Sequence, residues 1–160
     1  MTHPRRDPIR ENTLESYFEI SGPTRSIEKL AEISRPTPDS TSRLHEIASK
    51  PGSDLPLWIL KEFSAPLTRE EKMEWLKQWR AAPREEKIQM EDSQGWEVSE
   101  WLHWFSPDNQ YWKISTVTFG PGPEAMRIYI HHDDEPIPVG AIEWMISTAG
   151  ASISEIKRIT

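Results

Sequence analysis

The chain has 160 residues, a net charge of −7 and a mean hydropathy of −0.68, and it contains eight tryptophans but no cysteine. Without cysteine there are no disulfides, no thiolate nucleophiles and no cysteine-ligated zinc or iron–sulfur centres. The excess of carboxylates disfavours nucleic acid as the main partner, since phosphate backbones are bound largely by Lys and Arg.

The N-terminal third differs from the rest in composition. Residues 1–54 carry six of the fourteen prolines and only two of the fifteen aromatic residues, Tyr17 and Phe18. Apolar residues at helical spacing within residues 26–33 predict a short helix there. We therefore expect residues 1–54 to form a Pro-rich N-terminal extension with short helical pieces, and residues 55–160 to form a single globular domain. Neither a secretory signal nor a long apolar run is visible, so we expect a cytoplasmic protein without a membrane partner.

Two helices are predicted in the first part of that domain, after a short apolar element at residues 55–63 that we expect to be buried as helix or strand. Thr68 and Glu71 match a capping box, in which each side chain accepts a hydrogen bond from the other residue's backbone amide. This predicts a helix over Arg69–Ala82. Its apolar residues gather on one broad side: Met73, Trp75, Leu76 and Trp79. The following helix, from Pro83 to about Ser93, is highly charged and should be largely exposed.

Residues 95–112 hold four of the eight tryptophans and are the densest apolar stretch of the chain. A helical interpretation places one apolar stripe on the buried side: Val98, Trp101, Leu102 and Phe105. The opposite side then carries Trp96, Glu100, His103 and Trp104. In a strand, a shared face interrupted by Glu100 would instead hold Trp96, Val98, Leu102 and Trp104, with a turn after Phe105. The helix fits with fewer exceptions, and either element ends near Pro107.

The C-terminal part predicts a small antiparallel sheet. Residues 112–119 and 125–131 are rich in β-branched and aromatic residues and flank a Gly/Pro loop, which predicts a hairpin with one buried face. A helix is expected over Val139–Ala149, with Gly150 placed to end it. The predicted fold class is therefore α+β, with N-terminal helices followed by a small antiparallel β-sheet packed with a C-terminal helix. A last apolar row fits no single element type: Ile153, Ile156 and Ile159.

His131, His132, Asp133 and Asp134 form the run with the most reactive side chains. Histidine and carboxylate are ligands of zinc, manganese and iron(II), and His103 would supply a further nitrogen. In a strand, however, neighbouring residues point to opposite faces, so the four side chains converge only if the chain turns sharply. The sequence carries neither a serine-hydrolase elbow nor a phosphate-binding loop. We therefore expect no catalytic residue, no metal and no cofactor.

Tryptophans outside the buried stripes are the candidate binding residues. On the helical interpretation Trp96 and Trp104 project away from the apolar stripe, and Trp144 lies to the side of the stripe of the C-terminal helix. Tryptophan is enriched among the residues that dominate protein–protein binding. The alternative is that these side chains pack beneath a second layer of the same chain. The predicted partner-binding residues are Trp96, Glu100, His103, Trp104 and Trp144.

We expect a non-enzymatic protein-binding module, acidic and Trp-rich, of the immunity, inhibitor or adaptor type. Its partner would be another protein with a basic surface, although moderate acidity also serves simply to keep a protein in solution. A small enzyme or ligand-binding domain with a site at His131, Asp133 and His103 is the main alternative. A subunit of a larger assembly, including a homo-oligomer, is another, with residues 1–54 as a docking arm.

Overall fold

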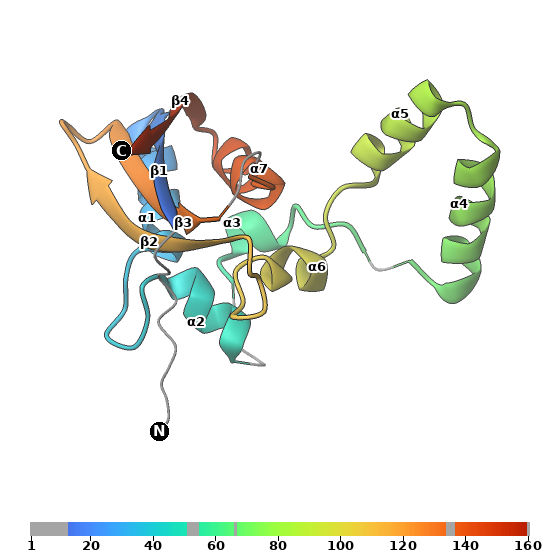
Figure 1. Cartoon of the computed structure of the whole chain (residues 1–160), viewed down its shortest axis with the longest axis horizontal. Helices are drawn as coiled ribbons and strands as arrows, with labels where there is room; N and C mark the ends of the chain where they lie inside the picture. The colour runs from blue at the N-terminus through green and yellow to red at the C-terminus, as the bar shows by residue number, and fades with distance from the viewer. Residues whose placement is uncertain (1–12, 51–54, 66, 134–136, 160) are drawn as a thin grey trace.

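The structure is a computed structural model that describes residues 13–50, 55–65, 67–133 and 137–159 (Figure 1). Within these ranges no helix is both long and apolar enough to cross a membrane. The described elements follow one another in the order β1 (Leu14–Ser21), α1 (Thr24–Ser34), α2 (Arg43–Ser49), α3 (Leu57–Leu60), α4 (Arg69–Ala81), α5 (Arg84–Gln94), α6 (Val98–His103), β2 (Trp112–Phe119), β3 (Ala125–His132), α7 (Gly140–Thr148) and β4 (Ser152–Ile159).

β1 lies inside a four-stranded antiparallel sheet with the strand order β2-β3-β1-β4. It pairs with β3 from Leu14 opposite His132 to Ser21 opposite Ala125, and with β4 along its other edge. Because α1 follows β1 and α7 joins β3 to β4, the connectivity is that of two interlocked split βαβ units, the ferredoxin-like arrangement. The helices α2 to α6 are an insertion between α1 and β2. The predicted α+β class is confirmed, although the sheet begins before the helices and not after them.

Side chains alternate across the sheet, so that one face is buried. β3 buries every second residue: Met126, Ile128, Ile130 and His132. On β1, Phe18 and Ile20 are fully buried on the same side. The opposite face carries the half-buried rings of Tyr17 and Tyr129, whose centroids are 5.3 Å apart. The predicted hairpin of β2 and β3 with one buried face is therefore confirmed.

The N-terminal segment that was expected to be an extension contributes to the core. Residues 14–21 form β1, which has a neighbouring strand on both edges. Leu30 of α1 and Leu44 of α2 are fully buried in the same core as the C-terminal residues. The low aromatic content of residues 1–54 as a whole concealed this strand, although both of their aromatic residues, Tyr17 and Phe18, lie in it. The structure thus differs from the expected division at Asp54: one core contains residues from both sides of it.

Aromatic rings join α6, α7 and the segment that follows α3. Trp101 of α6 is fully buried, and its Nε1 donates a hydrogen bond to the carbonyl oxygen of Ala141 at 3.0 Å. Three other aromatic rings surround it, with centroid distances of 4.7 Å to Phe105, 5.3 Å to Phe63 and 5.9 Å to Trp144. The helical interpretation of residues 95–112 is confirmed over Val98–His103. This cluster fastens the end of the insertion to the C-terminal helix.

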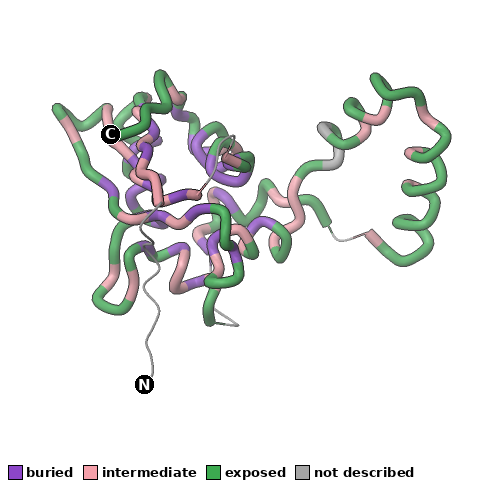
Figure 2. Tube along the Cα trace, viewed as in Figure 1, coloured by how far each residue is buried: buried purple, intermediate pink, exposed green. Residues whose placement is uncertain are grey.

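α4 and α5 form a hairpin that projects from the rest of the molecule (Figure 1). Figure 2 shows no buried residue along it: α4 has none, and neither has any described side chain of α5. The base of the hairpin is closed by a hydrogen bond from the amide of Ser64 to the carbonyl of Trp96 at 2.8 Å. The predicted capping box is present, with Thr68 Oγ1 accepting from the Glu71 amide at 3.1 Å and Glu71 Oε1 accepting from the Thr68 amide at 2.9 Å.

Candidate functional site

The five predicted partner-binding residues lie in different surroundings. Glu100 and His103 are exposed. The three tryptophans are half-buried against the core: Trp96, Trp104 and Trp144. Trp144 packs on Phe63, with 4.9 Å between the ring centroids. Of the five, only Trp104 lines the cleft described below. A role for these residues in partner binding stays a prediction.

A cleft of about 700 Å³ runs along β2, the edge strand of the sheet. Its walls come from α2, from residues 104–113 and from the end of β3, which are far apart in the sequence. The cleft is lined by His131, His132 and Asp133 and by two further basic residues, His45 from α2 and Lys113 from β2. The sequence pattern pointed to the first group but not to His45 or Lys113. His103 does not line the cleft, and Asp134 lies outside the described residues.

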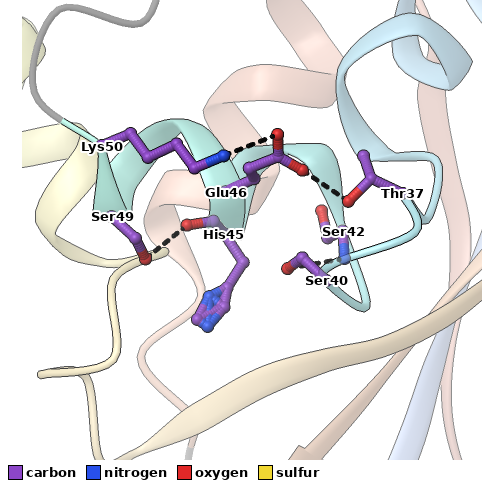
Figure 3. A network of polar contacts seen from close by, with 7 residues as sticks. All are labelled: Thr37, Ser40, Ser42, His45, Glu46, Ser49 and Lys50. Atoms are coloured by element: carbon purple, nitrogen blue, oxygen red, sulfur yellow. Dashed lines mark hydrogen bonds and ion pairs between the residues drawn. The ribbon is translucent and has the colours of Figure 1, made fainter.

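Hydroxyl groups hold α2 in place beside the cleft. Ser42 caps the helix, its Oγ accepting a hydrogen bond from the backbone amide two residues further on at 3.2 Å. Glu46 accepts a hydrogen bond from Thr37 Oγ1 at 2.5 Å, and Lys50 Nζ lies 3.4 Å from its other oxygen. The hydrogen bond from the Thr37 hydroxyl lowers the pKa of Glu46 most, and the charge of the Lys50 ammonium lowers it further. Figure 3 shows this network and the ring of His45 pointing away from it.

His45 is half-buried, and its Nδ1 is closed off from water with no hydrogen-bond partner among the described residues. Burial, followed by the positive charge of Lys113, lowers the pKa of His45. A neutral imidazole carries one ring proton, and a buried nitrogen that finds no acceptor favours placing the proton on the other nitrogen. His45 is therefore suited to offer Nε2–H to the cleft as a hydrogen-bond donor.

Lys113 supplies a positive charge to the cleft. Its Nζ donates hydrogen bonds to three backbone carbonyl oxygens, those of Asn109 at 2.9 Å, Pro107 at 3.2 Å and Ser106 at 3.5 Å. In the described part of the chain no carboxylate lies within 4.0 Å of it. Burial lowers the pKa of Lys113, and the more distant charge of Asp108 partly offsets this effect. The ammonium is thus held by backbone dipoles and not by an ion pair.

Three aromatic rings form one wall of the cleft. The indoles of Trp104 and Trp112 are parallel to within 3°, with centroids 6.5 Å apart, and the Tyr111 ring lies 6.1 Å from Trp104. Asn109, only 3% exposed, holds this wall together. Its Nδ2 donates to the carbonyls of Trp104 at 2.6 Å and Trp112 at 2.9 Å. Its Oδ1 accepts from the Tyr111 amide at 2.9 Å, so a single buried amide fixes the whole turn.

The two histidines of the reactive run point to opposite faces of the sheet, as adjacent strand residues do. His132 is 2% exposed, and its Nε2 lies 2.8 Å from the hydroxyl of Ser16. His131 Nε2 lies 3.9 Å from Glu15 Oε2 on the other face. Among the residues that the structure describes, no three His, Asp or Glu side chains are placed to hold a metal ion.

Trp79 of α4 contacts α5 through two side chains. Its Nε1 donates a hydrogen bond to Glu91 Oε2 at 3.1 Å, and Lys87 Nζ lies 4.6 Å from the ring centroid. The ring of Trp75 lies beside that of Trp79, with 16° between the planes and 6.4 Å between the centroids. These contacts leave three apolar side chains exposed: Met73 (63%), Ile88 (53%) and Leu76 (36%).

A shallow groove runs along α4 on the hairpin. Its lining includes the acids Glu70 and Glu74 and the bases Lys77 and Arg80. The remaining lining residues are apolar: Met73 and Ala81. The acids precede the bases along the helix. The groove therefore has a negative half and a positive half.

No protein-family profile matches the chain, and neither a characterised protein nor a solved structure matches it. The function is accordingly inferred from the geometry of the hairpin and of the cleft.

Proposed function

We propose that this protein is a non-enzymatic protein-binding module that docks through the α4–α5 hairpin onto a second copy of the same chain. The observation that carries the proposal is that no residue of α4 is buried, although this helix holds two tryptophans and Met73. Exposed apolar residues on a projecting element are typical of protein interaction sites. Trp96, Trp104 and Trp144 suit the main contact less well, since each already packs against the core.

The hairpin is short for a structure that stands alone. α4 has 13 residues and α5 has 11. Helices of this length are marginal in water unless an apolar face packs against another surface. Two hairpins packed face to face would form a four-helix bundle, which buries the apolar side of every helix. A second hairpin would in this way cover the exposed side chains of Met73, Leu76 and Ile88.

The order of charges along α4 favours a second copy as the partner. Glu70 and Glu74 precede Lys77 and Arg80 in the groove. When two α4 helices pair antiparallel about a twofold axis, the acidic half of each faces the basic half of the other. Parallel pairing would bring like charges together, which costs stability. The groove is therefore complementary to itself in one orientation only.

The proposal is tested by sedimentation of the full chain over a range of concentrations. We expect a dimer that dissociates on dilution. The variant Glu70→Lys, Glu74→Lys makes the groove wholly basic, and Lys77→Glu, Arg80→Glu makes it wholly acidic, so each alone should be monomeric. Mixing the two should restore a dimer, because every pair across the axis is then of opposite charge. Glu28→Lys, Glu124→Lys, on exposed positions elsewhere, is the matched control and should remain a dimer.

Two results would reject this function. A wild-type chain that stays monomeric at about 200 µM would exclude a second copy as the partner at ordinary affinities. A dimer that survives in both charge variants would place the contact outside the hairpin. The mixing experiment protects the test from misfolding, because a misfolded variant would not regain the dimer.

A further inference from the structure

We propose that the cleft along β2 binds a small aromatic carboxylate, with its charged end at Lys113 and His45 and its ring against Trp104. This site is separate from the hairpin and does not depend on the function proposed above. Ligand pockets commonly measure about 300–1,000 Å³ and combine apolar walls with a few convergent polar groups. The cleft, with its volume of about 700 Å³, has this character.

The end of the cleft at Lys113 is suited to binding an anion. Lys113 Nζ is surrounded by neutral carbonyl oxygens, the nearest at 2.9 Å, and forms no ion pair with any described residue. A carboxylate would supply the missing counter-charge by replacing the longest of the three carbonyl bonds, that to Ser106 at 3.5 Å, because a hydrogen bond between charged groups is about twice as strong as a neutral one. His45 also lines the cleft, and because its Nδ1 is buried, Nε2–H is the ring donor left for a ligand. Asp133 also lines the cleft and disfavours a dianion.

The wall beside this end is suited to a flat ring. Trp104 is half-buried, so part of its indole remains accessible, and the Trp112 ring lies parallel to it with the centroids 6.5 Å apart. Aromatic faces attract other rings in offset or edge-on stacking beyond the gain from burial alone. Asn109 ties both tryptophan carbonyls through its Nδ2, so the wall is formed before any ligand arrives. A preformed wall spares the ligand the entropic cost of ordering it.

The test compares two probes that differ only in charge, naphthalene-2-carboxylate and the neutral naphthalene-2-carboxamide. Each is titrated into the ¹⁵N-labelled full chain, and the indole N–H signals are followed by NMR. We expect the carboxylate to bind with a Kd of about 1 mM or tighter, the affinity that a fragment of this size reaches in a fitted pocket. The carboxamide should bind at least about tenfold more weakly. The signals of Trp104 and Trp112 should move, and those of Trp75 and Trp79 in the hairpin should not.

Substitutions test whether Lys113 and His45 bind the carboxylate. Lys113→Met keeps most of the side-chain length and should weaken carboxylate binding about tenfold or more, whereas Lys157→Met, on the far edge strand β4, should leave it unchanged. His45→Gln serves as a second variant should Lys113→Met disturb the fold, and should also weaken the carboxylate more than the carboxamide. Equal binding of the two probes, no binding at about 5 mM, or shifts confined to the hairpin would each overturn the proposal.

Discussion

The indole Nε1 of Trp101 on α6 donates a hydrogen bond of 3.0 Å to the carbonyl oxygen of Ala141 in the first turn of α7. Both residues are almost completely buried, at 0% and 1% exposure. The bond joins the last helix of the insertion to the helix that leads into β4. The insertion is therefore built into the core at this point, while its α4–α5 part stays outside.

Replacing Trp101 should be among the most damaging single changes in the chain. Trp101→Ala removes a fully buried ring and should lower the free energy of unfolding by about 3–5 kcal/mol. Trp101→Phe keeps most ring contacts but loses the hydrogen bond, and should cost about 1–3 kcal/mol. Urea denaturation followed by circular dichroism measures both. Trp75→Ala, on the projecting hairpin, is the control and should cost under about 1 kcal/mol. Equal losses for Trp101→Ala and Trp75→Ala would contradict this division between core and hairpin.

The hairpin should be removable without loss of the fold. The hydrogen bond between the Ser64 amide and the Trp96 carbonyl, 2.8 Å long, shows that the two ends of the segment meet. A short Gly/Ser linker in place of residues 67–94 can therefore close the chain without strain. We expect cooperative thermal unfolding with Tm within about 5 °C of the full chain at a concentration where that chain is monomeric, because none of the described side chains in the segment is buried. An unfolded deletion variant would show that the hairpin has a structural role.

The fragment 55–160 should not fold, even though the composition of the sequence suggests a domain boundary near Asp54. It lacks β1, the strand that pairs with both β3 and β4, and its loss would leave two unpaired edges and an open face on the core. We expect a near-ultraviolet circular dichroism spectrum without fixed aromatic signals and no cooperative transition. A cooperative transition at a Tm close to that of the full chain would mean that β1 is dispensable.

Short-range signals were sufficient for several elements. The capping box of Thr68 and Glu71, the β2–β3 hairpin and the helix ending before Gly150 each depend on residues a few positions apart, and all three are present. β1 was missed because only Phe18 and Ile20 are large, buried and apolar within it. β4 was not identified because its isoleucines recur at every third residue, whereas strands alternate with a period of two.

The cleft could be predicted only in part, for a similar reason. The sequence pointed to Trp104 because it lies in the Trp-rich residues 95–112. It pointed to His131 and Asp133 because they belong to a run of histidines and carboxylates. A single histidine in a short helix, such as His45, and a single lysine in a strand, such as Lys113, have no local signature. They meet only when α2 packs near the edge strand. The exposure of α4 was also hidden, since an apolar side on a helix does not reveal whether the same chain covers it.

Acid should destabilise the protein partly through His45. Burial and the charge of Lys113 hold the pKa of His45 below its value in the unfolded chain, ordinarily near 6.5. The unfolded state therefore binds more protons as the pH falls through this range, and the free energy of unfolding decreases. His131, His132 and Asp133 also line the cleft, and Asp108 lies near Lys113.

The contribution of His45 is isolated by difference. His45→Gln should lose less stability than the wild type when the pH is lowered from about 7.5 to 5.5, a window above the titration of most carboxylates. Urea denaturation at both pH values provides the four free energies needed. His103→Gln, at an exposed position outside the cleft, is the matched histidine variant for comparison. If His45→Gln reproduces the pH dependence of the wild type, the His45 ring accepts a proton as readily in the folded state as in the unfolded state, and its assignment as a neutral donor in the cleft is wrong.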